Sequence, residues 1–132
     1  QHPAIDLLIV PGGVVTAELD KPAVVERIAT LAAQARIAAA VCTGAFLLGR
    51  AGLLDGLQAT THWEDIADLQ RDFPQARIVA DRRWVDAGRI VTSGGISAGI
   101  DMSLHLVERL AGRDLALRTA RQMEYRWDEA IS

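Results

Sequence analysis

Short apolar runs alternate with segments of helical spacing along the first half of the chain, and this alternation is what most constrains the fold. The run Leu7–Val10 is continuously apolar and ends at Pro11–Gly13, which predicts a strand buried on both faces, as in a parallel sheet. Helical spacing follows over residues 21–36, with Asp20 as the candidate N-cap, and residues 37–41 form the next apolar run. The pattern predicts an α/β protein with an open, mostly parallel sheet and helices on both faces.

The rest of the chain continues this alternation and adds one hairpin. The expected elements are helices at 44–54, 64–73, 97–110 and 114–127, strands at 57–61 and 77–80, and a hairpin over Trp84–Thr92. No repeat or linker interrupts them, so residues 1–132 are expected to form a single domain. Because the chain starts at Gln1 and enters a core strand within a few residues, we also expect the N-terminal part of the fold to be missing from it.

Composition and charge argue against several classes of function. Half of the 132 residues are hydrophobic and the formal net charge is −3, so we expect this chain to bind neither nucleic acid nor a membrane surface. The single cysteine has no partner for a disulfide within the chain, which favours a reducing, cytoplasmic location. Its spacing to the three histidines does not fit a zinc site, so we expect no metal and no cofactor.

Cys42 lies where a strand-like run ends and a helix-compatible run begins. In an α/β fold such a junction delivers a side chain to the carboxyl edge of the sheet, and Gly44 eases the tight turn that exposes it. Free backbone N–H groups at the start of the next helix favour a thiolate. Cys42 is therefore a candidate nucleophile on a strained backbone, although a buried structural cysteine explains the position equally well.

Three further residues are expected at the same edge. The glycines at 12–13 let backbone N–H groups approach a ligand, so the N–H groups of Gly13 and Thr43 form a candidate oxyanion hole. His62 ends the expected strand 57–61, where a histidine can exchange a proton or pair with a thiolate. Each has a simpler explanation, because Pro-Gly-Gly is often only a turn and His62 can cap the helix that follows it.

Four other positions are given less weight. Residues 94–99 follow a strand and open a helix, but they do not match the dinucleotide pattern and indicate a tight turn. Asp101, in the first turn of that helix, is interpreted as a partner of the helix dipole. His105 is expected to face solvent or a partner, and Trp63 either walls a pocket beside His62 or packs in the core.

Four segments together resemble the ThiJ/PfpI superfamily, whose flavodoxin-like fold is that of class I glutamine amidotransferases. They are Asp-Leu-Leu-Ile-Val-Pro-Gly-Gly (6–13), Val-Cys-Thr-Gly-Ala-Phe-Leu-Leu (41–48), Ala-Thr-Thr-His-Trp (59–63) and Ile-Val-Thr-Ser-Gly-Gly-Ile-Ser-Ala-Gly-Ile-Asp (90–101). The resemblance implies that Cys42 is the nucleophile and that Thr43 and Gly13 supply N–H groups to the site. It also implies that His62 matches the family's histidine, that the protein is a homodimer, and that an acidic residue follows the family's first strand. No position of this sequence matches that acid.

Cys-Thr-Gly (42–44) and Gln-Met-Glu-Tyr (122–125) look most like the isonitrile hydratase branch. This resemblance favours an enzyme that adds water to a small-molecule substrate through the Cys42 thiolate, with an amidase or glyoxalase-type activity as a variant. Two alternatives stay open. The domain is a redox-sensing or ligand-binding module without catalysis, or it is the amidotransferase-like domain of an AraC-type regulator. The absence of a helix-turn-helix region before Ser132 counts against the regulator.

Overall fold

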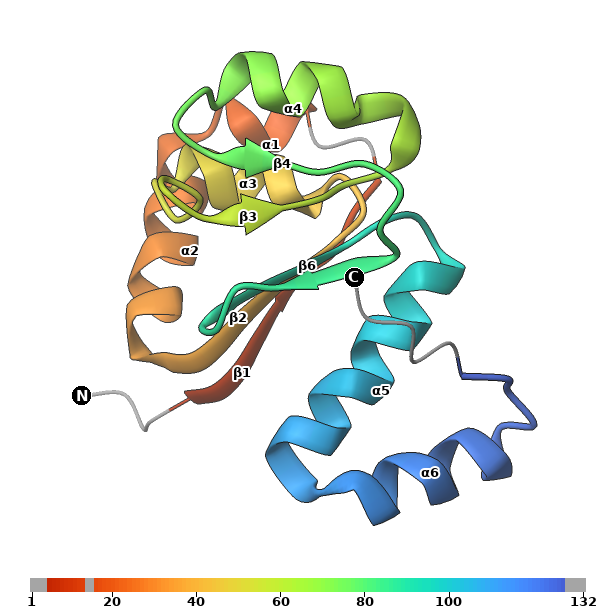
Figure 1. The fold of residues 1–132 in the computed structure, drawn as a ribbon. Coiled ribbons are helices and arrows are strands. Elements are labelled where there is room, and N and C mark those ends of the chain that lie inside the picture. Colours follow the sequence, from red (N-terminus) through yellow and green to blue (C-terminus); the bar gives the residue numbers. More distant parts are fainter. Residues whose placement is uncertain (1–4, 14–15, 128–132) are drawn as a thin grey trace.

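Helices cover both faces of a four-stranded sheet in the computed structural model, which describes residues 5–13 and 16–127 (Figure 1). The elements in chain order are β1 (Ile5–Val10), α1 (Thr16–Leu19), α2 (Pro22–Gln34), β2 (Ala35–Val41), α3 (Gly44–Arg50), β3 (Gln58–Ala59), the 3-10 helix η1 (Trp63–Asp65), α4 (Ile66–Asp72), β4 (Arg77–Ile78), β5 (Trp84–Asp86), β6 (Ile90–Ser93), α5 (Ser97–Ala111) and α6 (Arg113–Gln122). The expected α/β class with a mostly parallel sheet is confirmed.

The main sheet brings the ends of three strands to one edge. Its order is β1-β2-β6-β5, with β1, β2 and β6 parallel and β5 antiparallel to β6. Val10 pairs with Ala40, and Val41 pairs with Ser93. The segments that follow these strands, among them Pro11–Gly13 and Cys42, therefore leave the sheet side by side.

The segment before His62 does not join this sheet, which corrects the expected strand 57–61. Only Gln58 and Ala59 form a strand, and they pair with β4 in a separate two-stranded parallel sheet. The predicted hairpin explains the difference, because β5 takes the free edge of β6. The next residue, Thr60, reaches β6 through a side chain instead, with its N–H donating to Thr92 Oγ1 at 2.9 Å.

The core has two layers, one on each face of β2. Ala38 and Ala40 pack with residues of α2 and α3, among them Phe46 and Leu48. Ile37 and Ala39 alternate to the opposite face, where they pack with Trp84, Val91, Met102 and Leu106. Small side chains on the central strand let helices approach both faces closely, and this holds the end of β2, and so Cys42, in place.

One residue of the strand that was predicted to be buried on both faces is exposed. Val10, Ile37, Ile90 and Val91 are buried, but the Ile9 side chain is 45% exposed. In the described structure β1 is an edge strand that pairs only with β2, so its outer edge has no neighbouring strand. The apolar pattern of β1 is that of a strand with neighbours on both sides, and within the described residues it has a neighbour on one side, β2.

α3 and α6 end four or more residues before the sequence pattern predicts, because a left-handed residue follows each of them. Gly52 has φ 78° after α3, and Glu124 has φ 52° after α6. At both ends a backbone N–H bonds to a carbonyl five residues earlier, Leu53 to Leu48 and Tyr125 to Ala120, as in Schellman caps.

The N-cap of α2 also differs from expectation. It is Lys21 rather than Asp20, and it makes no side-chain cap bond. No helix among the described residues is long and apolar enough to cross a membrane.

Candidate active site

Cys42 occupies a sharp turn between β2 and α3, which we call the elbow. Its φ of 54° places a non-glycine residue in the left-handed region, so the expected backbone strain is confirmed. The Cys42 N–H donates to the Ser93 carbonyl at 3.1 Å, and the Thr61 hydroxyl donates to the Cys42 carbonyl at 2.8 Å. Hydrogen bonds to both the N–H and the carbonyl of Cys42 thus hold its strained conformation.

Two glycines let the elbow pack against the turn after β1. A Cβ on Gly12 would lie 2.8 Å from the Val41 carbonyl oxygen and 2.9 Å from Cys42 Cβ. A Cβ on Gly44 would lie 2.8 Å from the Pro11 carbonyl oxygen and closer still to that of Val10. Only glycine permits this approach, so the Pro-Gly-Gly sequence is more than a simple turn.

Thr43 and Gly13 lie together, as the sequence predicted, but they bond to each other. The Gly13 N–H donates to Thr43 Oγ1 at 2.9 Å, and that hydroxyl donates to the Gly13 carbonyl at 2.7 Å. The expected oxyanion hole therefore has one of its N–H donors bonded to the Thr43 hydroxyl in this structure. The hydroxyl has to rotate before that N–H can bind an anion.

His62 lies at the start of η1 and acts there as a cap. Its Nδ1 accepts a hydrogen bond from the Glu64 N–H at 3.2 Å and lies 3.8 Å from Glu64 Oε1 and 3.7 Å from Asp65 Oδ2. On the neutral ring the proton then resides on Nε2, an assignment made from this hydrogen bond. The capping role that the sequence left open is therefore present, and no hydrogen bond joins His62 to Cys42 among the described contacts.

The segment after β6 forms the other wall around His62. A Cβ on Gly95 would lie 2.6 Å from His62 Cδ2, so the imidazole rests on the Gly94-Gly95 turn. The Trp63 ring is tilted against the imidazole, with 5.9 Å between centroids. Trp63 is 78% exposed, so its alternative placement in the core is wrong.

Asp101 is a buried ion-pair partner of Arg83, and this replaces its interpretation as a simple helix-dipole partner. Its side chain is fully buried and lies 2.6 Å from the Arg83 guanidinium. The hydrogen bond to Asp101 raises the pKa of Arg83, against the effect of burial. Arg83 Nη2 also donates to Ser97 Oγ at 3.2 Å, so this pair ties the loop before β5 to the start of α5.

His105 belongs to a second titratable cluster, at the hairpin. Its ring stacks on Trp84 with 4.0 Å between centroids, and its Nε2 lies 2.7 Å from Asp86 Oδ2. Burial raises the pKa of Asp86, but hydrogen bonds from His105 and the Gly88 N–H and the charge of Arg109 outweigh it, and the net shift is downward. This cluster ties α5 to the hairpin and is separate from the elbow.

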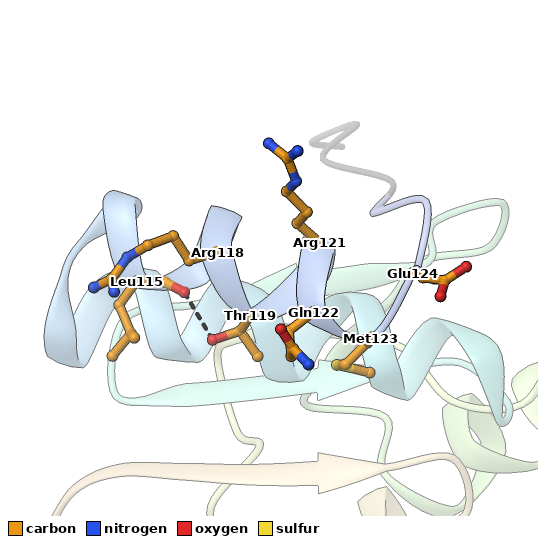
Figure 2. Close-up of a pocket in the computed structure, with 7 residues that line it drawn as sticks. All are labelled: Leu115, Arg118, Thr119, Arg121, Gln122, Met123 and Glu124. Atoms are coloured by element: carbon orange, nitrogen blue, oxygen red, sulfur yellow. Dashed lines mark hydrogen bonds between the residues drawn. The ribbon is translucent and has the colours of Figure 1, made fainter.

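Two other features of the described residues concern positions outside the elbow. A hollow of about 690 Å³ is lined by residues of α6 and the two residues that follow it, among them Arg118, Arg121 and Met123 (Figure 2). That helix packs against α5 and lies on the far side of α5 from the sheet (Figure 1). Among the described residues no group of three or more His, Cys, Asp or Glu side chains could hold a metal ion.

Sequence reasoning missed two contributors to the site. Thr61 was noted only as a strand-forming residue, yet its hydroxyl holds the Cys42 carbonyl. Gly95 was noted only as part of a turn, yet it supports the His62 ring. A threonine just before the histidine and a paired glycine before a helix were the available signals.

Comparison with known proteins shows the family. The sequence matches the DJ-1/PfpI family over residues 1–109. It is 41% identical over 127 residues to an isonitrile hydratase of Pseudomonas putida, a match that covers 93% of this chain and 53% of that protein. It is 40% identical over 126 residues to the HTH-type transcriptional regulator GbdR of Pseudomonas aeruginosa, covering 93% of this chain and 33% of the regulator.

The fold gives the same answer. The crystal structure of a ThiJ/PfpI family protein from Pseudomonas syringae superposes with a TM-score of 0.85 at 30% identity, over 95% of this chain and 51% of that one. The chain thus spans about half the length of the hydratase and a third of the regulator. The resemblance seen in its motifs is confirmed, and the chain belongs to the DJ-1/PfpI family.

Proposed function

We propose that the protein is a cysteine-dependent hydratase that converts a small isonitrile into an N-substituted formamide, with Cys42 as the nucleophile. The observation that carries the proposal is the elbow, where Cys42 has φ 54° and is held from both sides by Ser93 and Thr61. Such a turn presents a nucleophile at the carboxyl edge of a sheet. The 41% identity to an isonitrile hydratase supports the choice of reaction.

The proposed reaction consumes one water and involves no change of redox state. The Cys42 sulfur adds to the terminal carbon of R–N≡C while a proton is transferred to the same carbon, which gives the thioimidate R–N=CH–S. Water then adds to that carbon and its proton goes to the nitrogen. The C–S bond breaks, the thiol is regenerated and R–NH–CHO leaves.

We assign roles in this proposal to two of the named residues on the basis of their contacts. His62 carries its proton on Nε2 because Nδ1 accepts from Glu64, and Nε2 is therefore the atom that donates a proton to the site. Rotation of the Thr43 hydroxyl frees the Gly13 N–H for developing negative charge. In this proposal the proton on carbon comes from the acidic residue that, by the family resemblance, follows the family's first strand; no position of this sequence matches it.

Product analysis with Cys42 variants tests the proposal. The natural protein carrying this sequence is incubated with cyclohexyl isocyanide, and N-cyclohexylformamide is measured by liquid chromatography. Cys42→Ala is expected to abolish product formation, while Met123→Ala, at the exposed residue that follows α6, is expected to retain it. Product formation by Cys42→Ala at the wild-type rate would overturn the proposal.

A second candidate is the non-catalytic ligand-binding domain of a transcriptional regulator. The observation in its favour is the closed state of the site, with the Gly13 N–H bonded to Thr43 and His62 Nδ1 bonded to the Glu64 N–H. The 40% identity to GbdR agrees with it. Ligand binding without turnover, together with a gene that continues past Ser132 into a helix-turn-helix region, would favour this candidate over the hydratase.

A further inference from the structure

A cleft of about 600 Å³ adjoins the elbow, and none of the reaction steps proposed above takes place in it. Two of its lining residues belong to the site already described, since Thr61 bonds to the Cys42 carbonyl and Gly95 supports His62. The cleft is therefore joined to the elbow through Thr61, which bonds to the Cys42 carbonyl, and to the His62 ring through Gly95. Its volume is within the range of roughly 300–1,000 Å³ that is common for small-molecule sites.

The polar groups of the cleft are already bonded or balanced. The Thr60 hydroxyl donates to the Val79 carbonyl at 2.9 Å, and the Thr61 hydroxyl is bonded to Cys42. Arg83 is neutralised by the buried Asp101. Asp81 and Arg82 add opposite charges to the lining. The cleft thus carries no unbalanced charge that would favour an anionic or a cationic ligand.

The rest of the lining is apolar and includes a large exposed aromatic ring. Trp63, Ile66, Ala80 and Ala98 face the cleft, and Trp63 is 78% exposed. Covering an exposed indole with an apolar group is favourable, because it removes apolar surface of both groups from water. The cleft therefore fits a neutral apolar group of several carbons.

We propose that this cleft is the subsite for the N-substituent of the substrate, and that it selects bulky neutral apolar substituents over small or charged ones. The inference rests on the proposed function for its reaction. Trp63 supplies the surface on which the substituent packs. Ala80 has a small side chain, so the cleft keeps the space that a bulky substituent needs. Both residues determine specificity and neither takes part in bond making.

A ratio of specificity constants tests the subsite. The kcat/KM for cyclohexyl isocyanide is divided by that for methyl isocyanide, so that a purely structural defect, which lowers both constants, cancels. Trp63→Ala is expected to lower this ratio about tenfold, because the larger substituent loses its packing surface. Ala80→Trp is expected to lower it at least as far, because the new ring fills the cleft.

The controls are one substitution at an exposed position away from the cleft and one conservative substitution within the cleft. Met123→Ala removes a half-exposed apolar side chain just after α6 (Figure 2) and is expected to leave the ratio unchanged. Trp63→Phe keeps an aromatic surface and is expected to retain most of the selectivity. An unchanged ratio in both Trp63→Ala and Ala80→Trp, in active protein, would overturn the subsite.

A binding measurement separates the subsite from the reaction. N-cyclohexylformamide is titrated into the protein, and the fluorescence of Trp63 is obtained as the difference between the wild type and Trp63→Phe. A blue shift that is lost in Ala80→Trp supports the subsite even when no isonitrile is turned over, and only the hydratase proposal then fails. No shift at millimolar ligand, together with no effect on the ratio, rejects the subsite.

Discussion

The two sides of the elbow are both built on close approach to a glycine, but the approaching group differs. On the side of the turn after β1, the missing side chains of Gly12 and Gly44 make room for backbone carbonyls and for Cys42 Cβ. On the side of His62, the missing side chain of Gly95 makes room for an imidazole. Backbone cannot move without disturbing β1 or β2, whereas a side chain can rotate. The fold therefore positions Cys42, whereas side-chain contacts position His62.

Hydrogen bonds follow the same division. Cys42 is joined to Ser93 and Thr61, which lie far from it in the sequence. His62 is joined to Glu64, only two residues away. Changes on the glycine side are therefore expected to affect the stability of the whole chain, and changes on the histidine side to affect mainly the ring itself.

The largest effect is expected from Gly44→Ala. The new Cβ would meet the carbonyl groups of Val10 and Pro11, and neither can withdraw without displacing the end of β1. We expect a loss of about 3 kcal/mol in the free energy of unfolding, measured by urea denaturation.

Gly94→Ala is the matched control for this change. A Cβ on Gly94 would lie 3.6 Å from its nearest neighbour, the Thr61 carbonyl oxygen, which is an ordinary contact distance. We expect a change within about 0.5 kcal/mol. Equal losses in the two variants would mean that close backbone approach is not what makes the glycine side rigid.

A smaller effect on the same side is expected from Thr43→Val. The substitution keeps the shape but removes the hydroxyl that both accepts from and donates to Gly13. Because the freed groups can reach water, the expected loss is about 1 kcal/mol, measured by urea denaturation. Thr43→Ser keeps the hydroxyl and is expected to stay within half of that loss. Equal destabilisation by both variants would show that the methyl group, and not the hydrogen-bond pair, connects the two turns.

The sequence predicted the Cys42 side of the elbow better than the His62 side. The apolar runs and the Cys-Thr-Gly motif predicted the elbow, its strain and its contact with the Pro-Gly-Gly turn. These features depend on strands whose patterns are strong, and the parallel register then brings their ends together. The position of His62 depended on a strand that was expected to reach Thr61, and that strand ends at Ala59.

Tertiary partners account for most of what could not be predicted. Ile9 lies in a run typical of a strand with neighbours on both sides, and within the described residues β1 pairs with β2 alone, so Ile9 is exposed. Asp101 has the position of a helix-dipole partner but is buried against Arg83, which is 18 residues earlier. Thr43 was given a place in the site through its N–H group, and the bond between its hydroxyl and Gly13 depends on a register that no local signal encodes.

The smallest change in stability is expected from Gly95→Ala, and it tests the comparison most directly. The new Cβ would lie 2.6 Å from His62 Cδ2, a contact that the ring relieves by rotating. The free energy of unfolding is expected to change by no more than about 0.5 kcal/mol, while the NMR signals of the His62 imidazole shift because its bond to the Glu64 N–H is broken. In the His62→Ala background the same substitution has no ring to displace, so the two changes are expected to be coupled. If Gly95→Ala instead costs as much as Gly44→Ala, the imidazole is held as rigidly as the backbone, and the two sides of the elbow are equivalent after all.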